Sequence, residues 1–137
     1  MNHRDTEPHR ELISDSINRT SGLIVDAAYA VHSQLGPGLL ESVYEKCLVH
    51  AIRRRGLLVQ RQVLLPIEFE GLRLPTGLRL DLLVDNCVVV EIKASEGILP
   101  IHRAQLLTYL KLSGLRVGLL INFNVRLIKN GILRMAL

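Results

Sequence analysis

Apolar residues recur at helical spacing in two stretches of the first half of the chain. From about residue 14 to residue 35 they fall on one helix face, and Gly36-Pro37-Gly38 ends the pattern because proline disfavours helical backbone in the residue before it. A second apolar stripe covers residues 39–55 and is followed by Gly56, which suits the position after a last helical turn. The sequence therefore predicts two consecutive helices.

The pattern then changes to strands. Three apolar segments rich in β-branched residues follow, separated by the turn signals Glu70-Gly71 and Asp85-Asn86. These segments are residues 59–69, 78–84 and 88–93. Pro66 predicts a sheet edge or a bulge in the first of them, because proline cannot donate a hydrogen bond to a neighbouring strand.

The last third of the chain returns to a helix and ends in strands. Pro100 opens a helix over about residues 101–112, and residues 117–121 form a strongly apolar strand. Asn130-Gly131 is typical of a two-residue turn, so we expect a small hairpin that joins residues 125–129 to residues 132–135. The order ααβββαβ plus a C-terminal hairpin indicates a mixed α/β sandwich.

Length and composition fit one domain. The 137 residues are 48% hydrophobic and 22% charged, as in ordinary globular proteins, and we expect a polar, flexible segment at residues 1–13 before a single domain at 14–137. Neither a signal peptide nor an apolar run of ~20 residues is recognisable, so we expect a cytoplasmic protein without a membrane partner. Cys47 and Cys87 lie in apolar runs and are expected to be buried free thiols. The net charge of +4 favours polyanionic partners, although so small an excess does not decide the question.

Two acidic residues and a lysine interrupt the apolar strands. Asp81 lies in one strand, and Glu91 and Lys93 lie in the next. Strand alternation puts Glu91 and Lys93 on one face, and an isolated pair of this kind more often faces solvent. A buried carboxylate, however, is costly unless it is paired or bound to a metal. Asp81 in the neighbouring strand therefore favours a metal site.

The hairpin between these strands decides whether the two carboxylates meet. They share a face only if the loop has an odd number of residues or a bulge. A three-residue loop over residues 84–86 meets this condition and pairs Leu83 with Cys87, since Asn86 tolerates left-handed backbone. Asp81 would then lie diagonal to Arg79, the partner of Glu91.

A hard divalent cation such as Mg²⁺ or Mn²⁺ prefers oxygen ligands. Asp81, Glu91 and the carbonyl group of Ile92 would supply three, and the cation would lower the pKa of a bound water and neutralise charge on a phosphate. Lys93 would orient that water or stabilise the transition state.

Several motifs together resemble the PD-(D/E)XK nuclease superfamily. Besides Asp81 and the Glu91–Lys93 pair, residues 38–44 (GLLESVY) look like the GxxExxY signature of a small bacterial family placed in that superfamily. Gln105 and Tyr109 fit the Q-x-x-x-Y motif of RecB-like nucleases. The resemblance covers roughly residues 18–137, although Leu80 stands where the superfamily name has proline.

This resemblance implies a nuclease-like fold with the core order αβββαβ and assigns roles to single residues. It implies that Asp81 and Glu91 bind metal and that Lys93 is catalytic. It also implies that Glu41 completes the metal site, although an acidic residue near a helix start is equally explained by the helix dipole. Gln105 would lie near Lys93 or the DNA backbone, with Tyr109 beside it. The alternative for these last two is a tyrosine at the core edge with a polar neighbour.

Three further residues are candidate nucleic-acid contacts. Arg79 and Arg103 flank the predicted site in the sequence. His102 either contacts a phosphate or has a structural place near a helix end.

The sequence therefore predicts a Mg²⁺- or Mn²⁺-dependent nuclease that acts on nucleic acid, specifically DNA. The alternative is a non-catalytic nucleic-acid-binding or accessory protein on the same fold. A purely structural oligomer would give no reason for Asp81, Glu91 and Lys93 to interrupt apolar strands. The C-terminal hairpin or an exposed sheet edge could mediate a homodimer.

Overall fold

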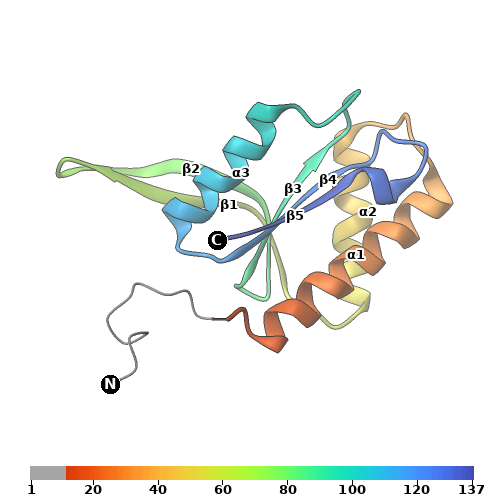
Figure 1. The fold of residues 1–137 in the computed structure, drawn as a ribbon, viewed down its shortest axis with the longest axis horizontal. Coiled ribbons are helices and arrows are strands. Elements are labelled where there is room, and N and C mark those ends of the chain that lie inside the picture. The colour runs from red at the N-terminus through yellow and green to blue at the C-terminus, as the bar shows by residue number, and fades with distance from the viewer. Residues whose placement is uncertain (1–11) are drawn as a thin grey trace, which may run out of the picture.

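The fold is a mixed α/β sandwich, seen in a computed structural model that describes residues 12–137 (Figure 1). Five strands form one sheet in the order β1-β2-β3-β4-β5. Helices α1 (Asp15–Leu35) and α2 (Glu41–Arg54) cover one face, and α3 (Pro100–Ser113) covers the other. The predicted fold class is confirmed. The predicted flexible segment falls mostly on residues 1–11, which lie outside the described residues.

Both early helices form where the apolar spacing predicts them. Ser14 caps α1, because its hydroxyl group accepts a hydrogen bond from the Ile17 N–H, and the helix ends at Gly36 with φ +69°. Helix α2 begins two residues later than predicted, so Glu41 is its first residue, preceded by Leu40 as the N-cap. The acidic side chain therefore lies at the positive end of the α2 dipole.

Strands β1 (Val59–Phe69) and β3 (Val88–Lys93) match the sequence prediction, whereas β2 (Leu72–Val84) starts six residues earlier than expected. The additional residues of β2 pair with β1, and the two strands project from the sheet as a two-stranded ribbon (Figure 1). The pairing register shifts between Leu65 and Ile67, which confirms the irregularity predicted at Pro66.

Helix α3 connects β3 to β4 (Val117–Asn122), which run parallel from the pair Val88–Val117 onward. The helix ends at Gly114, whose φ is +75°. This crossover places α3 on the face opposite α1 and α2. Among the described residues, no helix is both long and apolar enough to traverse a lipid bilayer.

The predicted C-terminal hairpin is wrong. Residues Ile128–Asn130 form a 3-10 helix, η2, and β5 (Ile132–Ala136) pairs antiparallel with β4. Gly131 has φ −103°, whereas a two-residue Asn-Gly hairpin turn needs positive φ. Pairing with β4 lets alternate residues of β5 extend the cores on both faces, which a local hairpin would not do. A homodimer through a sheet edge stays a prediction. A homodimer through the C-terminal hairpin has no basis, because that hairpin does not form.

Two apolar clusters hold the layers together. Under α1 and α2, the rings of Tyr44 and Phe123 stack with centroids 4.6 Å apart. Under α3, Leu106 and Leu110 pack on the other face of the sheet. Cys47 and Cys87 are free, as predicted, but each is only half-buried.

Gly131→Ala is expected to destabilise the protein by about 2 kcal/mol or more. A Cβ atom at this buried position would lie 2.1 Å from the Asn122 carbonyl oxygen, in the backbone of β4. The matched control is Gly22→Ala on the exposed face of α1, where a Cβ meets nothing within 4 Å. That change should stabilise the protein by about 0.5–1 kcal/mol. Urea unfolding of both variants measures the two effects.

Candidate functional site

The turn between β2 and β3 sets the position of the central carboxylates. The three-residue loop is 85–87, not 84–86, so Val84 pairs with Val88 and Leu83 pairs with Val89. The predicted pairing of Leu83 with Cys87 is therefore wrong, and so is the diagonal placement of Asp81 relative to Glu91. The loop starts at Asp85 because its N–H and its carboxylate bond the backbone of Leu58. The odd loop length holds, and the true register puts Asp81 opposite Glu91.

Strands β2 and β3 separate at the pair Asp81–Glu91, and we call this point of separation the fork. Ladder pairing stops at Leu82 and Val90. Beyond it, the Asp81 N–H donates to Glu91 Oε2 at 2.8 Å, and the Ile92 N–H donates to Asp81 Oδ2 at 2.9 Å. Each carboxylate thus takes the place of a backbone acceptor, so that Asp81 and Glu91 come together as the sequence predicted.

β2 reverses its faces at the fork. Leu82 and Val84 pack in the cluster under α1 and α2, whereas Leu78 and Leu80 pack in the cluster under α3. Regular alternation would put all four side chains on one face. The reversal at Asp81 therefore turns the rest of β2 out of the plane of β3.

β1 reverses with it, through Gln62. Val59 packs under α1 and α2, and Val63 packs against the α3 cluster. The pairing register is the same on both sides of Gln62, but the pair Gln62–Asp81 is missing from the ladder. Gln62 has φ +52°, a left-handed conformation that costs a non-glycine residue about 1–2 kcal/mol. Surrounding contacts must compensate for this strain.

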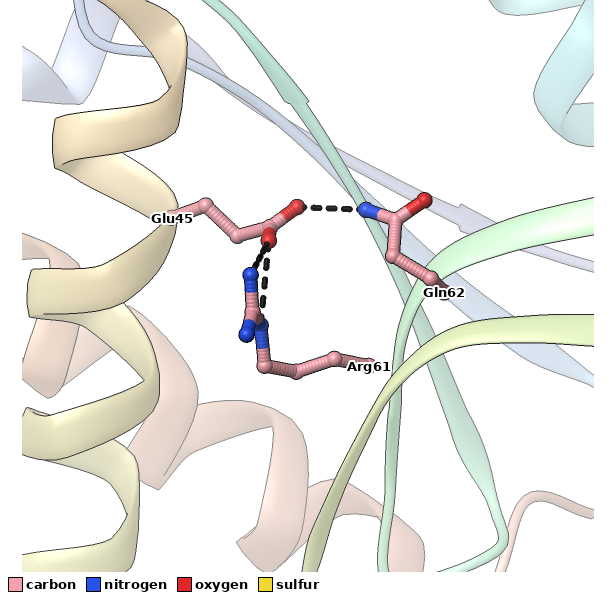
Figure 2. Close-up of polar contacts among 3 residues, drawn as sticks. All are labelled: Glu45, Arg61 and Gln62. Carbon is pink, nitrogen blue, oxygen red and sulfur yellow. Dashed lines mark hydrogen bonds and ion pairs between the residues drawn. The ribbon is translucent and has the colours of Figure 1, made fainter.

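Glu45 of α2 supplies those contacts, as Figure 2 shows. Its Oε2 accepts from Nε and Nη2 of Arg61 at 3.1 and 2.6 Å, and its Oε1 accepts from Nε2 of Gln62 at 2.8 Å. The Glu45 side chain is only 11% exposed. This cluster of Glu45, Arg61 and Gln62 was not predicted from the sequence. The available signal was the four-residue spacing from Glu41 to Glu45, which places both on one helix face.

The carboxylates share one electrostatic environment. Burial, followed by the charge of Asp81, raises the pKa of Glu91 to about 8. Burial also raises the pKa of Asp81, and the charge of Glu45 adds to that rise. At the exposed start of α2, partial desolvation and then the charge of Asp81 raise the pKa of Glu41. Lys93 opposes all three shifts without cancelling them, so the cluster is short of positive charge.

The donor chemistry of Asp81 and Glu91 fits a hard divalent cation. One oxygen of each carboxylate accepts a hydrogen bond from a backbone N–H. Within residues 12–137 no buried side-chain oxygen or nitrogen lacks a partner, and Asp81 is half-buried whereas Glu91 is only 4% exposed. No group of three or more His, Cys, Asp or Glu side chains in this part of the chain is arranged to hold a metal ion. Glu41 as a third side-chain ligand stays a prediction.

Helix α3 brings a second polar pair to the fork. Gln105 Nε2 donates to the Tyr109 hydroxyl group at 2.8 Å, so the two residues touch as the resemblance implied. Burial, followed by the charge of Glu91, raises the pKa of Tyr109. The pair therefore lies within electrostatic range of the carboxylates.

The remaining candidates divide into near and distant ones. Arg79 is exposed, and its charge lowers the pKa of both Asp81 and Glu91, which places it beside the fork. Arg103 is exposed on α3. His102 Nδ1 accepts from the Leu99 N–H at 3.1 Å, so it caps α3, as its structural alternative requires. Ile92 is buried in the sheet, and ligation by its carbonyl group stays a prediction.

Comparison with known proteins identifies one family. A family model described as the PD-(D/E)XK nuclease superfamily matches residues 18–135. The match runs from within α1 to within β5 and so includes every residue of the fork. No curated protein and no solved structure matches the chain. The finer GxxExxY family stays a prediction.

The metal-free protein is expected to lose stability as pH rises from about 4.5 to about 8. Unfolded glutamate ionises near its ordinary value of 4.5, whereas folded Glu91 keeps its proton up to a pKa of about 8, so rising pH in this window favours the unfolded state. Glu91→Gln cannot ionise and should flatten the decline. Above pH 8 the free energy of unfolding of Glu91→Gln should exceed that of the wild type by at least about 1 kcal/mol. This is less than the value of about 1.4 kcal/mol that corresponds to a shift of one pKa unit. Thermal melts in EDTA measure this, and an unchanged slope would contradict it.

Proposed function

The chain belongs to the PD-(D/E)XK nuclease superfamily, and from that membership we propose that it is a metal-dependent nuclease that hydrolyses phosphodiester bonds. One observation carries the proposal: Asp81 and Glu91 meet in the fork, each with one oxygen bonded to a backbone N–H, and with too little positive charge around them. A purely structural pair would gain more from ionic partners or from apolar replacement.

In this proposal Asp81 and Glu91 hold Mg²⁺ or Mn²⁺ together with the Ile92 carbonyl group and Glu41. When bound, such a cation lowers the pKa of a water molecule and offsets charge on the scissile phosphate. The raised pKa of Glu91 supports a cation here, because the carboxylate gains most from a positive charge at neutral pH.

Lys93 is proposed as the second catalytic group. It ends β3 half-buried, and its charge acts on Glu41, Asp81 and Glu91, as an ammonium group in the same cluster would. From there it would orient the attacking water or stabilise charge on the phosphate. Gln105, held by Tyr109, would position the lysine or contact the nucleic-acid backbone.

We propose nucleic acid, specifically DNA, as the substrate. The net charge of +4 and the exposed Arg79 beside the fork support a polyanionic partner. Arg103, His102 and Tyr109 on α3 are the other proposed contacts. A substrate phosphate in the fork would then lie between the ribbon of β1 and β2 and helix α3.

Cleavage of DNA with Mg²⁺ or Mn²⁺ is expected to fall at least about 100-fold in Asp81→Asn and in Lys93→Ala. Calorimetry with Mn²⁺ alone should show weaker binding in Asp81→Asn but retained binding in Lys93→Ala, because only the first change removes a ligand charge. EDTA should abolish cleavage by the wild type.

Metal-independent cleavage that survives in both variants would overturn this function. The non-catalytic alternative would be established if the wild type cleaves under no condition and DNA binding is equally strong in EDTA and in the Glu91→Gln variant.

Arg79→Ala should weaken DNA binding and reduce the salt dependence of the binding constant by about one unit of slope, since one phosphate contact is lost. Arg134→Ala serves as the control, because Arg134 lies on β5, at an edge of the sheet, and bonds Asn18 of α1. Equal salt slopes in the wild type and Arg79→Ala would exclude Arg79 as a phosphate contact.

A further inference from the structure

We propose that Glu45 is a positioning residue of the site: with Arg61 and Gln62 it clamps β1 onto α2 and so holds Asp81 in the fork. This inference rests on the proposed function only for its catalytic consequence. Its structural part concerns how the protein places Asp81, whatever the site binds.

The clamp is a built feature. Both carboxylate oxygens of Glu45 are occupied, one by two nitrogens of Arg61 and the other by the amide group of Gln62 (Figure 2). Glu45 is buried among these partners, with a side chain 11% exposed, whereas the Arg61 side chain is 43% exposed. Because both oxygens of Glu45 already hold partners on β1, the residue acts through those partners.

The clamp acts at the one position that faces Asp81. Gln62 lies opposite Asp81 in the register of β1 and β2, where the ladder pair is missing and both strands reverse their faces. Glutamine has no intrinsic preference for φ +52°, unlike glycine or asparagine. Its side-chain bond to Glu45 therefore ties this conformation to α2, and with it the backbone turn that sends Asp81 towards Glu91.

The clamp also orients α2 against the same strands. Glu41 lies one turn before Glu45 on the same helix, and the charges of Glu41 and Asp81 act on each other. Directly before Glu45, the Tyr44 hydroxyl group donates to the Gly36 carbonyl oxygen at 2.5 Å and accepts from the Leu39 N–H at 3.1 Å. The start of α2 is thus tied both to its preceding loop and to the fork.

Glu45→Ala tests the inference by amide hydrogen exchange on the metal-free protein. Loss of the clamp should speed exchange at the Asp81 and Ile92 N–H groups, whose acceptors are the two fork carboxylates, by about 10-fold or more. Exchange in central β4 should stay unchanged. Glu45→Gln should restore protection, because the new NH2 group can donate to the oxygen of a flipped Gln62 amide, while the new carbonyl oxygen still accepts from Arg61.

The matched control is Glu68→Ala, which breaks the exposed ion pair between Glu68 and Arg73 farther along the same strand. It should leave exchange at Asp81 and Ile92 as in the wild type. If Glu45→Ala does not fold, Gln62→Ala carries the test, since alanine lacks the amide group but keeps the cost of the left-handed backbone. In a folded variant without the clamp, exchange at both groups within twofold of the wild type would overturn the inference.

Two further readouts connect the clamp to the chemistry. Mn²⁺ affinity measured by calorimetry and kcat should each fall about 10-fold in Glu45→Ala and recover in Glu45→Gln. KM should change less than kcat. A wild-type protein that neither binds Mn²⁺ nor cleaves would refute the proposed function alone, because amide exchange needs no metal and still decides on the clamp.

Discussion

The exchange of hydrogen bonds between Asp81 and Glu91 is the interaction on which the site depends. Where the ladder between β2 and β3 stops, backbone N–H groups need other acceptors, because an unpaired buried N–H group is costly. Here the carboxylate of each residue accepts one such N–H from the opposite strand. The same two contacts therefore finish the sheet and bring two negative charges together. Burial, and after it the charge of Asp81, raises the pKa of Glu91 to about 8.

The reversal of β1 and β2 makes room for this arrangement. Because both strands turn at the pair Gln62–Asp81, their inner side chains leave the cluster under α1 and α2 and join the cluster under α3. The ribbon then diverges from β3 (Figure 1), and the two carboxylates follow directly after the last ladder pair, Leu82–Val90. The strained backbone of Gln62 is thus part of what separates the ribbon from β3 at the site.

Membership of the PD-(D/E)XK nuclease superfamily and the geometry of the fork support each other from different directions. The family match covers nearly the whole chain but does not by itself say how these side chains are held. The structure adds that helices on opposite faces both reach the fork, α2 through Glu41 and Glu45 and α3 through Tyr109. The site is therefore a product of the whole sandwich rather than of one hairpin.

The sequence by itself determined the elements whose signals are local. Apolar spacing and the glycines after the first two helices set the helix bounds closely, and β-branched residues marked β3 without error. It also brought Asp81 and Glu91 together, because strand parity needs only the loop length. Tertiary contacts decided the rest. The hydrogen bond between the Leu58 N–H and the Asp85 carboxylate places the hairpin loop one residue later than predicted. The pairing of β5 with β4 replaces the expected C-terminal hairpin. The Glu45 cluster joins residues 16 and 17 positions apart, a separation at which no sequence periodicity indicates contact.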